Sequence, residues 1–140
     1  MNAPLYTTDI LRLAASLPAP SALDRVDARS EQRSPTCGSR VAVAVQVGPD
    51  GRVAAVSQEV HACAFGQAAA ALMARNAVGR SPADAEATLG ALAGWLAGAR
   101  DDPGDWPGLA ALAPARSRTS RHGAILLPFR ALAAALRSAR

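Results

Sequence analysis

An alternating segment, VAVAVQVGPDGRVAAVSQEVHAC at residues 41–63, holds the clearest structural information in this chain. Valine occupies every second position of its first seven residues, so one face of a predicted strand is strongly apolar. The turn-forming run GPDG at residues 48–51 follows, and residues 52–62 return to an extended pattern. We therefore predict an antiparallel hairpin that delivers Cys63 to the end of its second strand.

Helical periodicity lies on both sides of this hairpin. Apolar residues at helical spacing predict a short first helix that ends at Pro18. The alanine-rich segment 64–78 predicts a helix that can approach the sheet closely, and Ser81, followed by proline, predicts the capped start of another helix. A short helical turn is expected at residues 109–112, and a terminal amphipathic helix from near Pro128.

The order of these elements predicts an α+β fold, with a small antiparallel sheet of two or three strands and helices packed on one face. We expect a single domain over residues 1–140, because a chain of this length can bury about 68–70% of its unfolded surface. Residues 18–34 lack periodicity and predict an irregular connection. Residues 114–121 predict an arginine-rich loop.

The charge of the chain is uneven along its length. Every basic residue is arginine, the formal net charge is +4, and Asp105 is the last acidic residue. The C-terminal part therefore predicts a positive surface that suits an acidic partner. No aromatic residues interleave with these arginines for base stacking, so we expect no nucleic-acid binding.

The location is predicted from what the sequence lacks. The N-terminus has no secretory pattern, and no uninterrupted apolar run reaches the ~18 residues that a membrane span needs. We expect a cytoplasmic protein without membrane association. In a reducing compartment two cysteines are expected to be reactive or metal-ligating rather than paired.

Cys37 and Cys63 are the residues most suited to chemistry. Cys37 lies in the turn-forming run SPTCGS at residues 34–39, and Cys63 stands where the second strand gives way to a helix. A helix N-terminus favours a thiolate through its free backbone N–H groups and partial positive charge. One cysteine precedes the hairpin and the other follows it, so we expect the two thiols to share one site that could hold a metal ion.

Structural interpretations of the same residues stay open. Cys63 could be a small buried residue, since free cysteine is among the most buried residue types. His122 could be a surface histidine, and the alternation of the strand makes His61 structural or solvated. Ser39 could orient a ligand or satisfy its own turn.

Two motifs carry a resemblance to a known family. PTCGS at residues 35–39, the hairpin, and ACAFGQAAAALM at residues 62–73 resemble the IscU/NifU-type iron-sulfur cluster assembly scaffold proteins. The likeness spans roughly residues 5–136 and is strongest in the helix after Cys63. Such scaffolds receive sulfur from a cysteine desulfurase, assemble a [2Fe-2S] cluster on three cysteines with help from an aspartate or histidine, and pass it to acceptor proteins.

The resemblance implies roles for individual residues. Cys37 matches the first ligand cysteine of the family and Cys63 the second, while His122 matches the histidine that commonly precedes the third. An iron-sulfur cluster, iron or zinc is the implied metal cargo. A cysteine desulfurase and cluster-acceptor proteins are the implied partners, and the protein is expected not to be an enzyme.

Two departures from the family pattern change the ligand count. Ser39 replaces the aspartate of Cys-Gly-Asp, and the third cysteine falls at Gly123 or, with a one-residue shift, at Ala124. A cluster requires four protein ligands, and this chain can supply two thiolates and one imidazole. Two protomers could supply four cysteines in a homodimer, or the two cysteines and the histidine could hold one zinc or iron ion.

Three functional hypotheses follow. The first is a divergent scaffold that binds iron, a labile cluster or zinc through Cys37 and Cys63. The second is a protein-interaction module that keeps the scaffold shape without cluster assembly and binds an acidic partner. The third is a sulfur-relay protein that carries a persulfide on one activated cysteine.

Overall fold

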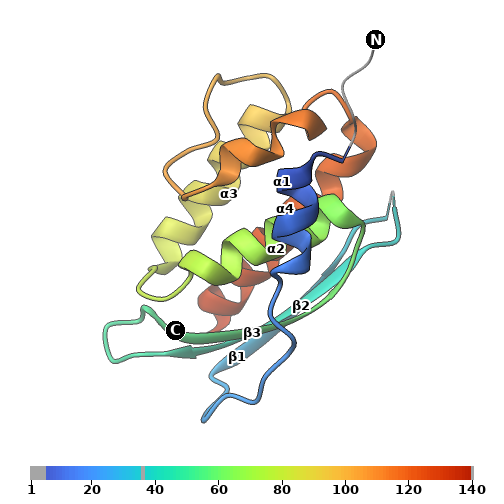
Figure 1. Cartoon of the computed structure of the whole chain (residues 1–140). Coiled ribbons are helices and arrows are strands. Elements are labelled where there is room, and N and C mark those ends of the chain that lie inside the picture. Colours follow the sequence, from blue (N-terminus) through green and yellow to red (C-terminus); the bar gives the residue numbers. More distant parts are fainter. Residues whose placement is uncertain (1–5, 36, 140) are drawn as a thin grey trace.

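A three-stranded antiparallel sheet forms one layer of the molecule. The computed structural model describes residues 6–35 and 37–139. The strands are β1 (Ala28–Arg33), β2 (Arg40–Val47) and β3 (Val53–His61), in the spatial order β1-β2-β3. Figure 1 shows the helices gathered on one face of this sheet, which confirms the predicted α+β fold and includes the third strand.

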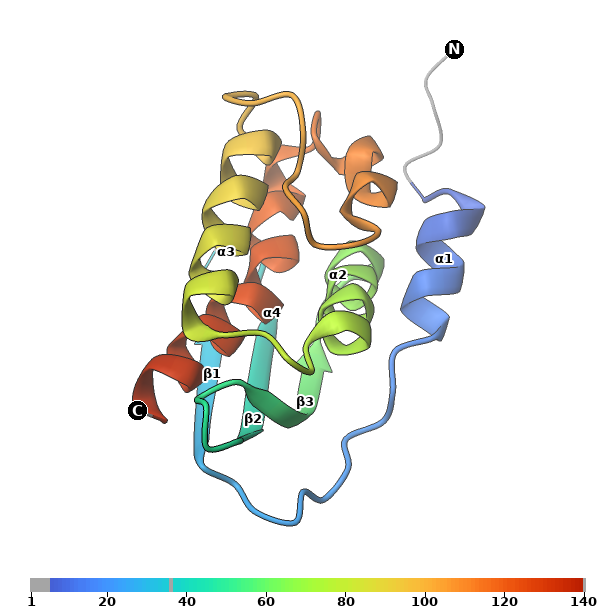
Figure 2. The same ribbon diagram turned by 90° about the vertical axis from the view of Figure 1, so that its left-hand side faces the viewer.

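The second layer is helical. It consists of α1 (Thr8–Ala15), α2 (Ala64–Asn76), α3 (Pro82–Leu96), the 3₁₀ helix η1 (Leu109–Ala115) and α4 (Thr119–Ser138). Helix α4 packs over β1 and β2, and α2 packs against β3, as the turned view in Figure 2 makes clear. Helix α1 packs on α2 and α3 packs on α4. No helix among the described residues combines the length and apolar character required to cross a bilayer.

The core lies between the sheet and the helices. Val41, Val43 and Val45 are buried and point to the helical side, as the alternation predicts. Helix α2 buries a run of alanines among β3, α1 and α4, so its backbone comes close to its neighbours. A Cβ on Gly66 of α2 would lie 2.6 Å from the Cβ of Ala62 and 3.3 Å from the Cβ of Ala124, which shows how little space remains there.

The irregular connection predicted for residues 18–34 is wrong for its last part. Residues 28–33 form β1 and pair with β2 from Ala28 opposite Val45 to Arg33 opposite Arg40. This strand has the sequence ARSEQR and alternates half-buried with exposed positions, so it carries no apolar signal of its own. Pairing with β2 and packing of α4 decide its structure, and residues 18–27 remain outside any helix or strand.

The arginine-rich loop predicted for residues 114–121 is also shorter than expected. Helix η1 continues to Ala115, and α4 begins at Thr119 rather than near Pro128. An interior proline costs a helix about 3 kcal/mol, because it lacks an N–H and crowds the preceding turn. Burial of large apolar side chains such as Ile125 and Phe129 contributes about 1.5–3 kcal/mol each, which outweighs that cost.

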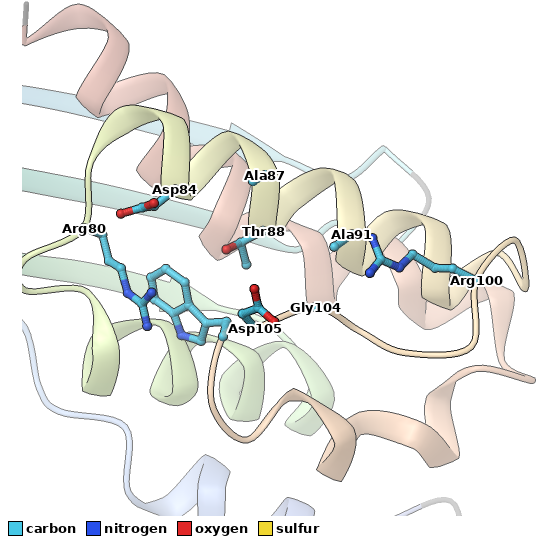
Figure 3. Close-up of a pocket in the computed structure, with 9 residues that line it drawn as sticks. Arg80, Asp84, Ala87, Thr88, Ala91, Arg100, Gly104 and Asp105 are labelled. Atoms are coloured by element: carbon cyan, nitrogen blue, oxygen red, sulfur yellow. The ribbon is translucent and has the colours of Figure 1, made fainter.

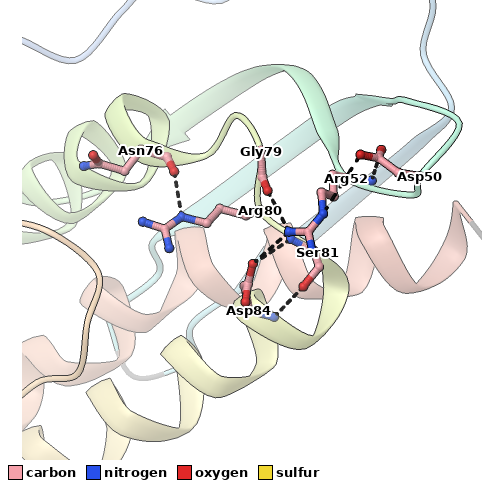
Figure 4. Close-up of polar contacts among 7 residues, drawn as sticks. All are labelled: Asp50, Arg52, Asn76, Gly79, Arg80, Ser81 and Asp84. Carbon is pink, nitrogen blue, oxygen red and sulfur yellow. Dashed lines mark hydrogen bonds and ion pairs between the residues drawn. The ribbon is translucent and has the colours of Figure 1, made fainter.

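The start of α3 confirms the predicted cap. The Asp84 backbone N–H donates to Oγ of Ser81 over 3.1 Å, and the Ser81 N–H donates to Oδ2 of Asp84 over 3.0 Å. The bond from the Ser81 backbone is the largest cause that holds the pKa of Asp84 below its usual range. Arg52, the residue before β3, donates to the Gly79 carbonyl and lies 3.6 Å from Asp84, as Figure 4 shows. These contacts tie the start of β3 to the turn between α2 and α3.

Candidate thiol site

The register of the sheet brings the two cysteine-bearing segments to one end of the molecule. Arg40, the first residue of β2, pairs with His61, the last residue of β3. Cys37 lies just before Arg40 in the loop between β1 and β2, and Cys63 lies just after His61 at the start of α2. Figure 1 shows this loop and the β3–α2 junction at the same end of the sheet.

The Cys37 loop is short and held by backbone bonds. The Ser34 N–H donates to the Ser39 carbonyl over 2.9 Å, and the Gly38 N–H donates to the Ser34 carbonyl over 3.0 Å. Gly38 adopts a φ of +71°, a left-handed conformation that favours glycine, and no atom lies near its missing side chain. Cys37 is exposed, so a ligand or partner can reach its sulfur.

Two serine hydroxyls shape the chemistry of Cys37. Its Sγ lies 3.1 Å from Oγ of Ser39, to which the thiol donates. Partial burial raises the pKa of the Cys37 thiol, but hydrogen bonds to the Ser34 and Ser39 side chains and to the Ser39 backbone together lower it by more. The pKa of Cys37 therefore lies below that of an ordinary cysteine, and thiolate is the reactive and metal-binding form.

Cys63 has a different environment. It is the N-cap residue of α2, with φ −66° and ψ 173°, and its side chain makes no capping hydrogen bond. Its side chain is half-buried and packs against the hydrophobic core. The position at a helix start is as predicted, and the buried-residue interpretation describes part of its surroundings.

Helix α4 supplies a third segment to the same end of the sheet. A Cβ on Gly123 would lie 2.5 Å from Oγ of Ser34, and the next residue, Ala124, has its Cβ 3.3 Å from the Cβ position of Gly66. Residues 123 and 124 of α4 therefore border both the Cys37 loop and the start of α2. The space next to Gly123 is filled by the Ser34 hydroxyl, which also bonds Cys37.

His122 is turned toward backbone carbonyls. Its Nε2 lies 2.8 Å from the Ala115 carbonyl oxygen and 3.1 Å from that of Arg116. Carbonyls only accept, so Nε2 carries the hydrogen and ties α4 to the end of η1. His122 is thus a half-buried helical residue rather than the surface histidine that the sequence allowed.

A ready three-ligand group is not assembled in the structure. Within residues 6–35 and 37–139, no three His, Cys, Asp or Glu side chains come close enough together to hold a metal ion. Use of His122 beside Cys37 and Cys63 therefore stays a prediction, which requires its ring to leave the two carbonyls. His61 is exposed at the end of β3.

Ser34 is the site residue that sequence reasoning missed. It is 3% exposed, it contacts the position of Gly123, and it bonds Cys37. Its place in the run SPTCGS indicates a turn, but nothing in the sequence marks its contact with a helix that begins 85 residues later, at Thr119. Only the packing of α4 on the sheet creates this contact.

Comparisons with known proteins agree with this architecture. The chain is similar to a crystal structure of a nitrogen-fixing NifU-like protein (N-terminal) from Brucella abortus, with a TM-score of 0.87 and 32% identity over 96% of this chain and 93% of that one. No family model and no curated protein matches the sequence.

Two further solved structures share the fold. One is described as an iron-sulfur cluster assembly scaffold protein for the SUF system from the thermophile Fervidobacterium islandicum AW-1, with a TM-score of 0.84 and 19% identity over 94% of this chain and 96% of that one. The other is a hypothetical protein with a TM-score of 0.69 and 20% identity, over 92% of this chain and 96% of that one.

Proposed function

This chain belongs to the IscU/NifU family of iron-sulfur cluster assembly scaffold proteins, and from that premise we propose that it binds iron, a labile iron-sulfur cluster or zinc as cargo through Cys37 and Cys63. The observation that carries this proposal is the meeting of the two cysteine-bearing segments at one end of the sheet, where Cys37 is exposed and its pKa is lowered. A cysteine desulfurase and cluster-acceptor proteins are the proposed partners.

The ligand count shapes the form of the cargo. A [2Fe-2S] cluster takes four protein ligands, and Cys37 and Cys63 supply two. Gly123, one of the two positions at which the family's third cysteine could fall, is packed against Ser34, so a side chain there could not reach the metal without a shift of the loop. We propose a cluster shared between two protomers, or a single ion with positions left open for exchange.

Anaerobic titration with ferrous iron and sulfide tests this proposal. We expect visible absorbance to develop in the native protein and to be lost in Cys37→Ala and in Cys63→Ala. His122→Ala, compared with the matched variant His61→Ala, tests whether the imidazole takes part. Metal analysis of freshly purified protein distinguishes iron from zinc. Equal absorbance in the native protein and in the Cys63→Ala variant would contradict the proposal.

The surroundings of Cys37 favour a second candidate, a sulfur relay. An exposed thiolate with hydroxyl neighbours can attack the outer sulfur of a donor persulfide. The new S–S bond forms at Cys37, the donor S–S bond breaks, and the donor leaves as a thiolate that takes up a proton. Mass spectrometry after incubation with a cysteine desulfurase and cysteine should find one added sulfur on Cys37.

An interaction module without cargo predicts a different result. Partner capture would then survive replacement of both cysteines and would weaken with added salt, because charge would carry the contact. Loss of capture in the double cysteine variant excludes that role. The same variant therefore separates cargo binding from simple docking.

A further inference from the structure

A cavity lies between α3 and the loop that follows it, away from the two cysteines. Its volume is about 250 Å³, which is below the range of about 300–1,000 Å³ typical of drug-sized ligands. Figure 3 shows Arg80 and Arg100 at its two ends, with Thr88 and Asp105 between them. The walls are therefore charged and polar, and any ligand must be small.

Arg80 is fixed in place at one end of the cavity. Its Nε donates to the Asn76 carbonyl over 3.0 Å, and its guanidinium lies 4.5 Å from the centre of the Trp106 ring. Trp106 is itself held, because its Nε1 donates to the Leu72 carbonyl over 2.9 Å. The terminal nitrogens of Arg80 make no hydrogen bond to any other described residue.

Asp105 and Thr88 add an unpartnered carboxylate and hydroxyl. Among the described residues, neither side chain makes a hydrogen bond, and Asp105 forms no ion pair. Thr88 is 9% exposed, so the little surface that it keeps includes its side of the cavity. Both groups can therefore accept a ligand without first giving up a hydrogen bond to a described residue.

The other two charges at the cavity are already engaged. Asp84 belongs to the cap of α3 and lies 3.6 Å from Arg52, and Arg100 donates to Asp102 over 2.9 Å. Arg80 also attracts Asp84, and that attraction helps to lower the pKa of Asp84, but it forms no ion pair with a described carboxylate. The terminal nitrogens of Arg80 and the carboxylate of Asp105 are therefore the charged groups on the cavity wall that can take a ligand. An anionic ligand alone would meet Asp105, and a cationic ligand alone would meet Arg80.

The loop that carries Asp105 is packed rather than free. A Cβ on Gly104 would lie 2.8 Å from the Cβ of Ala91 on α3, so the loop sits directly on the helix. The Gly104 N–H also donates to Oδ1 of Asp102 over 3.0 Å. The backbone next to Asp105 is therefore fixed before any ligand arrives, which reduces the entropy cost of binding.

We propose that this cavity binds a small zwitterion, a free α-amino acid, with its carboxylate on Arg80 and its ammonium group on Asp105. The Thr88 hydroxyl lies between the two charges and serves as a further hydrogen-bond partner. Binding is independent of the cysteines, since none of the lining residues belongs to the thiol site.

Nuclear magnetic resonance titration of the ¹⁵N-labelled protein tests this site with alanine, acetate and methylamine as probes. The indole N–H of Trp106 and the Nε–H of Arg80 report on the cavity, and the indole N–H of Trp95, which does not line it, is the internal reference. We expect saturable shifts with alanine at a dissociation constant of about 1 mM, and binding weaker by about tenfold for acetate and for methylamine.

Matched variants complete the test. Asp105→Asn should weaken alanine binding by about tenfold, the effect of losing one charge-assisted hydrogen bond. Asp101→Asn, an exposed acidic residue of the same loop outside the cavity, should leave it unchanged. Asp105 is exposed, so its replacement does not threaten folding. Equal binding of acetate, no saturable shift, or an Asp105→Asn variant that binds alanine normally would each overturn the proposal.

Discussion

The segments that carry Cys37 and Cys63 lie at the same end of the sheet, but the two cysteines belong to different parts of the structure. Cys37 is exposed in a loop whose serine hydroxyls lower the pKa of its thiol. Cys63 is half-buried at the start of α2 and packs against the core. Gly66 of the same helix has no room for a side chain. Changes near Cys37 should therefore alter reactivity, while changes near Cys63 should alter stability.

The largest expected effect is on the Cys63 side of this comparison. Gly66→Ala places a methyl group 2.6 Å from the Cβ of Ala62, and overpacking of this kind costs about 1–3 kcal/mol. Gly90→Ala is the matched control, because Gly90 is also helical and has open space around it. It should gain about 0.5–1 kcal/mol. Urea unfolding of both variants measures the difference, and equal stability of the two would contradict the tight packing.

A second variant examines the contact between α4 and the Cys37 loop. Gly123→Cys puts a cysteine at one of the two positions that the resemblance gives for the third ligand, but its Cβ would lie 2.5 Å from Oγ of Ser34. We expect Gly123→Cys alone to lose about 1–2 kcal/mol of stability. Ser34→Ala removes the clashing oxygen, so the double variant should recover stability and retain more iron after anaerobic reconstitution. Equal iron retention by the double variant and by Ser34→Ala alone would argue against this role of residue 123.

The reactivity of the two thiols sharpens the comparison further. Cys37 should react with iodoacetamide about tenfold faster than Cys63, a barrier difference of about 1.4 kcal/mol, because Cys37 is exposed and the pKa of its thiol is lowered, whereas Cys63 is half-buried. Peptide mass spectrometry over a time course measures both rates. A faster reaction at Cys63 would reverse the proposed assignment of the two environments.

The pH dependence of the Cys37 reaction follows from its lowered pKa. Its rate should reach half of its maximum at a lower pH than the rate of an ordinary cysteine thiol. Folding favours the thiolate, so this contribution to stability is present above the unfolded pKa and is lost as the pH falls through the folded pKa. Ser39→Ala should move the midpoint upward, whereas Ser120→Ala, an exposed serine of α4, should not.

The smallest expected effect is that of a substitution far from both thiols, which serves as a reference for the alkylation rates. Ser81→Ala removes the hydroxyl that accepts from the Asp84 N–H, and loss of such a cap costs about 1 kcal/mol. Neither alkylation rate should change, because the cap stands at the other end of β3. A change in the Cys37 rate in this variant would mean that the reactivity difference reflects global stability rather than local environment.

Much of the fold could be predicted because its signals are local. The alternation of valines, the turn at residues 48–51, the Ser81 cap and the alanine-rich helix each follow from a few neighbouring residues. Strand β1 could not be predicted in this way, since ARSEQR has no apolar face and pairs only because β2 offers an edge.

Some features of the candidate site could be predicted from local sequence, and others depend on tertiary packing. The hairpin predicted that the segments of Cys37 and Cys63 would lie side by side, and the sheet register places both segments at one end of the sheet. The surroundings of His122 could not be predicted, because Gly123 and Pro128 are poor helix formers and lie inside the helix that contains it. The contact of Ser34 with Gly123 joins two segments that are distant in the sequence, and only tertiary packing reveals it.

The Ser34–Gly123 contact also constrains which substitutions can add a third thiol to this end of the sheet. A cysteine at position 123 alone meets the Ser34 oxygen and is penalised, while a change at Ser34 alone adds no ligand. The two substitutions should therefore be favourable only in combination, which is sign epistasis between two segments that are distant in the sequence.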